Sequence, residues 1–387
     1  MSNQMFKNSK SFAVFFIFTF LLSACAGFFE KDNTPAPTPL TNYTPELAPR
    51  LLWSAKVGYG ASGSDYLKMN PAVSNSAVYT ASTDGVVTST NKTTGRRIWQ
   101  TSVRESLSSG PGVGDGLVVV GGTRGHLVAL QQADGRQLWR ASIPGEIIAT
   151  PAVGHGFVVV KAVDGYTRGL SATDGHEVWA FQQVEPNLIL RGSSAPLIRD
   201  SSVIAGYANG NLAKLNLNDG HLSWLQTIAV PEGAFAIQRM IDIDADPVVF
   251  EHRIYVATYQ GKISSLDWTS GNTLWTHDIS SYTGMAADSN SVYISDAKGM
   301  VWGFNADSGL VNWRQNRLEY RIISGPAATR NHVVVGDAEG YLHWLSKTDG
   351  HFAARVSLGS AIYAAPIVEN DVLYALTTSG YLAAYKS

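Results

Sequence analysis

Three aspartates at alternate positions, Asp242, Asp244 and Asp246, have the spacing of a cation-binding loop. A calcium loop of the EF-hand type takes oxygen ligands at such intervals, with a glycine at its turn and a bidentate glutamate at its end. Here Pro247 stands where the turn needs glycine, and Arg253 stands where the glutamate is needed. The sequence therefore excludes an EF-hand-type site, and we predict no bound metal.

The usual catalytic signatures are also missing from the sequence. It contains no Gly-x-Ser-x-Gly elbow, no His-Glu-x-x-His pair and no paired-cysteine metal pattern. The glycine cluster from Gly110 to Gly116 lacks the strand-then-helix setting in which glycines cradle phosphate. Nine histidines are present, but they form no spaced cluster. We therefore predict a protein that is not an enzyme and needs no cofactor.

Cys25, the only cysteine, is a candidate for covalent modification. Two lysines precede the apolar run from Phe12 to Leu22, which is too short for a comfortable membrane span and is typical of an export signal. The segment ending Leu-Ser-Ala-Cys25 resembles a bacterial lipobox, which implies removal of residues 1–24 and lipidation of Cys25. An ordinary signal peptide that happens to contain a cysteine is the alternative. In lipobox signals an aspartate after the cysteine favours the inner membrane, so Ala26 implies a lipid anchor in the outer membrane, facing the periplasm.

Residues 25–50 have the composition of a linker, because five prolines stand among threonines and asparagines between positions 35 and 49. Such a segment cannot bury a core and favours an extended chain. We predict a tether that joins the lipidated cysteine to a folded domain over residues 51–387.

A repeat governs the rest of the chain. Its first glycine is usually followed by an alternating apolar run, and a second glycine stands ten residues later in the first seven copies. Six copies carry a tryptophan four residues further on, and the seventh has Ala354 there. The eight first glycines are Gly85, Gly125, Gly165, Gly210, Gly261, Gly299, Gly340 and Gly380.

Each copy contains four short segments with the period-two alternation of β-strands, separated by turn residues. One four-stranded sheet cannot bury both faces, so a period near 40 residues of this kind predicts stacked sheets in a ring. The fold class is therefore all-β, an eight-bladed β-propeller of four-stranded antiparallel blades. The in-frame tryptophans should pack between blades, and the alternative is a ring of aromatics that stack on a ligand.

The two ends of the chain indicate how the ring closes. The last copy stops after its third strand, while residues 51–57 form a tryptophan segment with no copy before it. We therefore expect the N-terminal strand to complete the last blade, which removes a free sheet edge.

Charge excludes one class of partner. Without residues 1–24 the chain has 27 basic and 31 acidic residues, a balance of −4 with histidine neutral. Because nucleic acid is held by clustered lysine and arginine, we predict no nucleic-acid binding.

Function should lie where the repeat is irregular, since loops on a rigid scaffold carry binding residues. The connection from the tryptophan position to the next in-frame proline spans 12 or 13 positions in four copies, but 17 after Trp179, 23 after Trp224 and 18 after Trp53. The connections after Trp179 and Trp224 leave consecutive blades and should lie side by side. They hold Leu188, Leu190 and Arg191 in the first and Asp242 and Asp244 in the second, which suits a protein interface. Alternatively, both connections bury these side chains, with Arg191 paired to one of the two aspartates.

The repeats resemble those of quinoprotein (PQQ-dependent) dehydrogenases, but a chain with one cysteine cannot supply the adjacent cysteine pair of those enzymes. The fuller resemblance is to the BamB family, lipoproteins of the outer-membrane β-barrel assembly (BAM) complex, which combine a lipobox, a short tether and this propeller. In that family a Leu-x-Leu-Arg loop and a neighbouring Asp-x-Asp loop contact the POTRA domains of BamA. The resemblance implies this partner-binding role for Leu188, Leu190, Arg191, Asp242 and Asp244.

The expected function is thus a non-catalytic periplasmic scaffold that binds BamA and other BAM subunits and aids insertion of unfolded outer-membrane proteins. The alternatives are a lipid-anchored quinoprotein dehydrogenase and a propeller lectin or adhesin. Transient pairing of blade edges with substrate strands is a further possibility, although the sequence marks no particular edge.

Overall fold

The structure is a computed structural model that describes residues 35–59, 67–186, 188–190 and 192–387. The chain divides into two units, Met1–Ala36 and Pro37–Ser387, and every described strand belongs to the second. The predicted signal, Cys25, most of the first half of the tether and Arg191 lie outside the described residues. Within the described ranges, no helix has the length and apolar character needed to span a bilayer.

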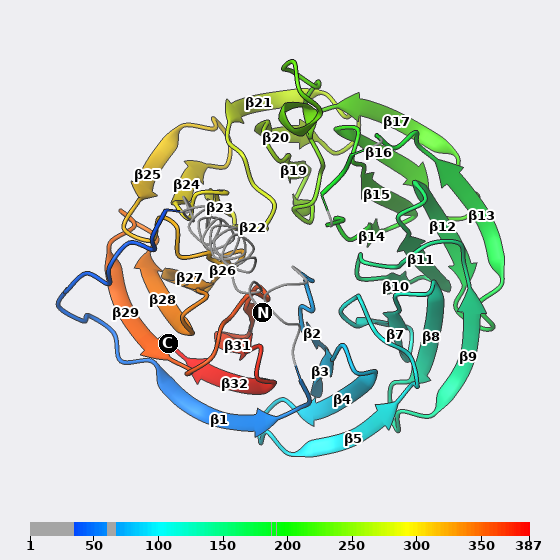
Figure 1. The fold of residues 1–387 in the computed structure, drawn as a ribbon, viewed down its shortest axis with the longest axis horizontal. Helices are drawn as coiled ribbons and strands as arrows, with labels where there is room; N and C mark the ends of the chain where they lie inside the picture. Colours follow the sequence, from blue (N-terminus) through cyan, green and yellow to red (C-terminus); the bar gives the residue numbers. More distant parts are fainter. Residues whose placement is uncertain (1–34, 60–66, 187, 191) are drawn as a thin grey trace, which may run out of the picture. The chain divides into compact units, whose positions relative to one another are not determined.

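The described residues form eight four-stranded antiparallel sheets, arranged around a common axis in Figure 1. In the first seven, the strands pair in chain order from the axis outwards. The first four sheets are β2 (Ala72–Val73), β3 (Ala77–Ala81), β4 (Val86–Asn91) and β5 (Arg97–Ser102); β6 (Gly112–Gly114), β7 (Leu117–Gly121), β8 (His126–Gln131) and β9 (Gln137–Ser142); β10 (Ala152–Gly154), β11 (Phe157–Lys161), β12 (Tyr166–Ser171) and β13 (Glu177–Gln182); and β14 (Leu197–Arg199), β15 (Ser202–Gly206), β16 (Asn211–Asn216) and β17 (Leu222–Thr227).

The other four sheets follow the same plan, and one short 3-10 helix, η1 (Ala236–Arg239), lies between the fourth and fifth sheets in the chain. These sheets are β18 (Val248–Phe250), β19 (Arg253–Ala257), β20 (Lys262–Asp267) and β21 (Thr273–Asp278); β22 (Met285–Ala287), β23 (Ser291–Ser295), β24 (Val301–Asn305) and β25 (Val311–Gln315); β26 (Ala327–Ala328), β27 (His332–Gly336), β28 (Tyr341–Ser346) and β29 (Phe352–Ser357); and β30 (Ile367–Glu369), β31 (Val372–Leu376), β32 (Tyr381–Lys386) and β1 (Arg50–Lys56).

The middle strands are buried on both faces, because neighbouring sheets cover both faces of each sheet. In β11, for example, Val158, Val159 and Val160 are all fully buried, although successive side chains point to opposite faces. This confirms the predicted all-β propeller of eight four-stranded blades.

The N-terminal strand completes the eighth sheet, as predicted. β1 pairs antiparallel with β32, with Arg50 opposite Lys386 and Lys56 opposite Tyr381. The innermost strands β2 and β30 also touch, so the ring closes at its centre as well. Closure gives each of the eight described sheets two neighbours.

The tryptophans of the repeat pack between blades, as predicted. A Cβ on Gly135 would lie 2.5 Å from the ring of Trp99 in the preceding sheet, so only glycine leaves room for the indole. The indole of Trp99 also donates to the carbonyl of Gln132 at 3.0 Å. The same contacts join sheet to sheet elsewhere, and the other indoles that donate across the joint are Trp53, Trp139, Trp179, Trp275 and Trp313.

In the seventh sheet, a tryptophan from a different strand fills the joint to the next sheet. Trp344 lies on β28 directly opposite Ala354 on β29, so the large and the small side chain have exchanged strands relative to the other copies. Trp344 is fully buried, meets Tyr385 of the eighth sheet edge to face at 6.0 Å, and donates its indole N–H to Ser387 Oγ at 3.1 Å. The missing tryptophan of the repeat is therefore replaced from the neighbouring strand.

Residues 38–47, which the sequence assigns to the tether, lie against the seventh sheet. Thr38 donates its backbone N–H to Glu319 O at 3.0 Å, and Glu46 donates its N–H to Ala353 O at 2.9 Å. The ring of Tyr43 lies 5.8 Å from that of Phe352. Proline and threonine do not build a core of their own, but they leave backbone groups free to bond a surface that already exists.

Candidate protein-binding surface

The long connections after Trp179 and Trp224 lie side by side, as predicted. The backbone N–H of Leu190 donates to Asp242 Oδ1 at 3.1 Å, and that of Ala195 donates to Asp246 Oδ1 at 2.7 Å. The second connection thus supplies acceptors for backbone donors of the first. A connection lies outside the sheets, so its backbone N–H groups have no strand partner. Without the carboxylates they would have to bond water.

The predicted site residues differ in their exposure. The side chain of Leu188 is 45% exposed and that of Leu190 is half-buried, whereas Asp242 and Asp244 are 1% and 3% exposed. Neither carboxylate therefore reaches the accessible surface, which is the buried arrangement that the sequence left open for these two residues. Arg191 lies outside the described residues, so its predicted pairing with an aspartate remains a prediction.

Two lysines supply positive charge beneath the connections. Lys161, at the end of β11, is buried and donates to the carbonyl oxygens of Gly206 and Ser194. Lys68 donates to the carbonyl of Asp244. Because Lys68 belongs to the long connection before the first sheet, all three long connections meet at this point.

Burial dominates the electrostatics of this cluster. It raises the pKa of Asp242 to about 7, with repulsion from Asp244 adding to the shift. It raises the pKa of Asp244 to about 6, although Lys68 and Lys161 oppose the change. It lowers the pKa of Lys161 to about 8, against the attraction of Glu185, Asp244 and Asp246. The carboxyl groups therefore serve as internal acceptors that are costly to ionise.

Lys161 and Lys68 belong to this site but are not among the residues predicted from the sequence. A signal for Lys161 exists, because it directly follows the β-branched run from Phe157 to Val160 in a strand that is otherwise apolar. A lysine at such a position needs acceptors or carboxylates in the interior. Lys68 has no comparable signal, since its partner is a backbone carbonyl far along the chain.

The second connection also exposes apolar side chains. Phe235 and Ile237 are 68% and 61% exposed at the short helix η1. Gln238 holds this turn, since its Oε1 accepts from the N–H groups of Ala234 and Phe235, and Gln260 Nε2 donates to Ile237 O at 3.1 Å. A fixed turn that presents apolar groups to solvent is typical of a protein-binding surface.

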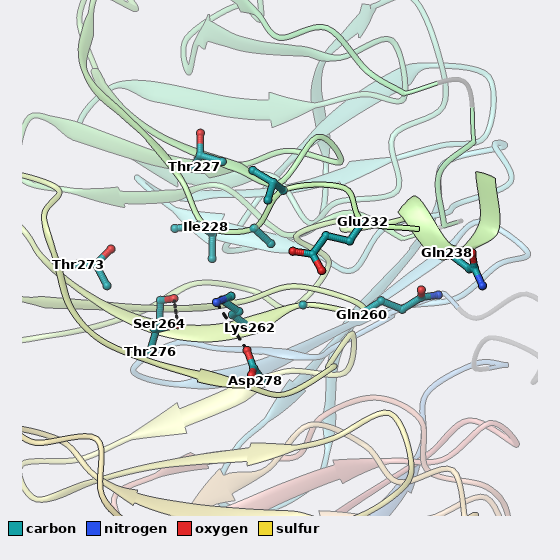
Figure 2. A pocket seen from close by; sticks show the side chains of 13 residues that line it. Thr227, Ile228, Glu232, Gln238, Gln260, Lys262, Ser264, Thr273, Thr276 and Asp278 are labelled. Carbon is teal, nitrogen blue, oxygen red and sulfur yellow. Dashed lines mark hydrogen bonds and ion pairs between the residues drawn. The ribbon is translucent and has the colours of Figure 1, made fainter. Parts of the chain in front are cut away.

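A hollow of about 620 Å³ lies beside this turn, between the fourth and fifth sheets (Figure 2). One wall is the pair β20 and β21, where Ser264 faces Thr276 at 3.0 Å and Lys262 pairs with Asp278 at 3.6 Å. Three other copies carry Arg168, Trp302 and His343 at the position of Ser264, whereas the remaining four carry Thr88, Val128, Ala213 and Ala383. The hydroxyl groups of Ser264 and Thr276 give this wall a lining that can hydrogen-bond a partner.

A second hollow of about 310 Å³ lies where the three long connections meet, and Leu190 and Leu67 line it together with Lys68, Asp244 and Tyr259. This lining does not fit the anionic quinone of the dehydrogenases. Its lysine already donates to a backbone carbonyl, and its carboxylate would repel an anion. Among the described residues, no group of three or more histidine, aspartate, glutamate or cysteine side chains could hold a metal ion.

Comparison with known proteins identifies relatives of the whole propeller. A family model described as "Outer membrane protein assembly factor BamB" matches residues 83–315 and 297–387. The assembly factor BamB of Alkalilimnicola ehrlichii is 46% identical over 95% of this chain and 94% of its own length. BamB of Legionella pneumophila is 42% identical over 91% of this chain and 92% of its own length.

Solved structures agree with this result. The crystal structure of BamB from Moraxella catarrhalis superposes with a TM-score of 0.80 at 26% identity, covering 88% of this chain and 100% of that one. Quinohemoprotein alcohol dehydrogenase from Comamonas testosteroni superposes with a TM-score of 0.69 at 13% identity, covering 87% of this chain and 76% of that one, which shows a shared fold alone. The chain belongs to the BamB family of outer membrane protein assembly factors.

Proposed function

We propose that this chain is a non-catalytic scaffold for the assembly of outer-membrane proteins and that its long connections bind a protein of the assembly machinery. The observation that carries the proposal is the exposed Leu188 on a connection whose backbone is held by a carboxylate of its neighbour. Pre-organised apolar anchors beside a polar rim favour protein association, because little ordering is needed on binding. The family motif points to the POTRA domains of BamA as the partner.

The five motif residues divide into two roles in this proposal. Leu188, Leu190 and Arg191 contact the partner, with Arg191 making a charge-assisted hydrogen bond. Asp242 and Asp244 position the first connection from below, because they are buried and Asp242 accepts its Leu190 N–H. Phe235 and Ile237 extend the apolar contact onto the second connection.

Lipidation of Cys25 anchors the scaffold to the outer membrane on its periplasmic side. Several acyl chains on one cysteine would make the attachment stable, since a single chain binds only marginally. Other BAM subunits and unfolded outer-membrane proteins are further partners in this proposal.

Leu188→Asp is expected to weaken binding of the POTRA domains about tenfold, because a charge replaces an apolar anchor at the interface. Binding of the purified domains is measured by calorimetry. Leu138→Asp is the matched control, since Leu138 is 41% exposed at the bulge of β9, away from the long connections. Equal binding by the two variants would contradict the proposed surface.

Uptake of the quinone tests the dehydrogenase alternative. Incubation with the quinone and calcium is expected to give neither the absorbance of the bound cofactor nor dye-reducing activity, because the lysine in the described lining of the second hollow already donates to a backbone carbonyl. Stoichiometric uptake of the quinone with substrate-dependent dye reduction would establish the enzyme instead.

A further inference from the structure

We propose that residues 38–47, the strap, fix where the chain leaves the propeller. The face that carries the long connections is then turned towards the membrane that holds the lipid anchor. This inference rests on the proposed lipidation of Cys25. It also depends on a set of contacts within the described residues, which run along the outer strand of the seventh sheet.

The first end of the strap is held by the connection between the sixth and seventh sheets. Thr38 donates both its N–H and its hydroxyl to Glu319 O, at 3.0 and 2.8 Å. Arg321 donates from Nη1 to Thr38 O at 3.0 Å. Arg321 is itself buried and fixed by Asp337 at 2.8 Å and Glu339 at 2.6 Å, so this end of the strap meets a rigid donor.

Arg355 of β29 holds the middle of the strap. Its guanidinium donates to Thr41 O at 3.3 and 3.4 Å and lies 5.1 Å from the centre of the Tyr43 ring. The Nε of Arg355 donates to His343 Nδ1 at 3.2 Å, and His343 Nε2 in turn contacts Asp337 at 2.9 Å. A chain of buried polar groups thus joins the two arginines that bind the strap.

The second end of the strap meets the start of β29. The N–H groups of Glu46 and Leu47 both donate to Ala353 O, at 2.9 and 3.2 Å. The carboxylate of Glu46 lies 2.9 Å from His351 Nε2. Leu47 packs against the apolar core between the seventh and eighth sheets. From this end the chain continues directly into β1.

The seventh copy of the repeat is adapted to the strap. The first residue of the outer strand is exposed in the copies that begin with Arg97, Gln137, Glu177, Leu222, Thr273 and Val311. In β29 this residue is Phe352, which is buried and lies under Tyr43. The ring of Phe352 would be exposed without the strap. Residues of the propeller, and not only those of the strap, are therefore suited to this docking.

The strap runs from one face of the propeller to the other. In an antiparallel sheet, the connections from outer to next inner strand and the turns between the two middle strands emerge at one face, and the remaining turns emerge at the other. Thr38 contacts Glu319 on such a connection, and Glu46 contacts His351 in a turn at the opposite face. The chain towards Cys25 therefore departs from the face of the long connections.

Docking also shortens the free tether. Without the strap, 25 residue steps separate Cys25 from β1, whereas 13 separate it from Thr38. At most about 3.5 Å per residue, the reach falls from roughly 85 to roughly 45 Å. A shorter tether that starts at this face holds the long connections nearer to the membrane that carries the partner, which raises their effective concentration.

The test uses the full lipidated chain in vesicles of phosphatidylethanolamine and phosphatidylglycerol with acceptor-labelled headgroups. A donor dye is placed on Ala234→Cys, in the second long connection, or on Ala133→Cys, in a turn of the opposite face. Energy transfer is expected to be about twofold higher from position 234, because the short tether departs from the face on which this position lies. Equal transfer from both positions would overturn the proposal.

A strap-release variant, Tyr43→Ala with Glu46→Ala and Leu47→Ala, should abolish the difference between the two labels. Thermolysin cleavage at Leu40 should become about tenfold faster in this variant, since cleavage tracks local opening. Asn42→Ala with Thr44→Ala is the matched control, because both residues are exposed on the strap. Cleavage of the unaltered strap as fast as that of the release variant would show that it does not dock.

The two proposals fail separately. If the protein does not float with the vesicles, lipid anchoring is wrong, and the thermolysin rates still judge whether the strap docks. If the protein floats but the POTRA domains do not bind, the proposed partner is wrong, and the energy transfer still reports which face lies towards the bilayer.

Discussion

Trp344→Ala is expected to lower the free energy of unfolding by about 3 to 5 kcal/mol, the usual cost of deleting a large buried aromatic side chain. Trp344 fills the joint between the seventh and eighth sheets, where it meets Tyr385 and bonds Ser387. This joint is next to the strand pair that closes the ring, so its loss should loosen both chain ends. Chemical denaturation followed by tryptophan fluorescence and circular dichroism measures the effect.

A double variant tests whether the side-chain volume at this joint, rather than the strand that carries the tryptophan, determines stability. Trp344→Ala with Ala354→Trp restores the arrangement of the other copies, and it should recover part of the lost stability because the total side-chain volume is conserved. Trp268→Ala is the control, since Trp268 is only half-buried and lies in a turn between strands. If Trp344→Ala unfolded at the denaturant concentration of the parent, the exchange of strands would have no energetic role.

Asp242→Asn is expected to raise the free energy of unfolding by about 2 to 4 kcal/mol at pH 8. The folded pKa of Asp242 is raised to about 7 from an ordinary value of 3.8, chiefly by burial and further by Asp244 and Glu185. The folded state is therefore favoured by protonation: this contribution is complete below pH 3.8 and is lost as the pH rises through about 7. Asparagine avoids that loss and keeps an oxygen that accepts the Leu190 N–H. Denaturation curves at pH 4 and pH 8 should show a gain that is confined to the higher pH.

The same position distinguishes positioning from direct contact. Asp242→Asn should bind the POTRA domains as tightly as the parent, whereas Asp242→Ala should bind less tightly because the Leu190 N–H loses its acceptor. If Asp242→Asn were as weak as Asp242→Ala, the carboxylate charge would contact the partner directly. Calorimetry at pH 8 with both variants decides between the two roles.

The architecture could be predicted from the repeat because every copy carries the same signals for turns and strands. Glycine spacing, strand alternation and the unpaired segments at the two ends suffice to predict eight closed blades. Connection length likewise located the candidate surface, since insertions in a regular scaffold must emerge from it.

Orientation within the connections could not be predicted in the same way. The sequence left open whether Asp242 and Asp244 face a partner or are buried. Both are buried in the structure, close to a backbone donor of the first connection and to the amines of Lys161 and Lys68. These partners come from distant strands and have no periodic signal. The strap was missed for a similar reason: its docking depends on Phe352 and Arg355, which lie some 300 residues away in the chain.

Pairing of β1 with β32 has a consequence for how the polypeptide acquires its shape. Arg50 pairs with Lys386, so the first strand of the propeller to be synthesised stays unpaired until its last strand has been made. Contacts of such long sequence separation form slowly, and an unpaired strand edge invites aggregation in the meantime. Closure of the ring by β1 and β32 is therefore the pairing of this propeller that we expect to form last.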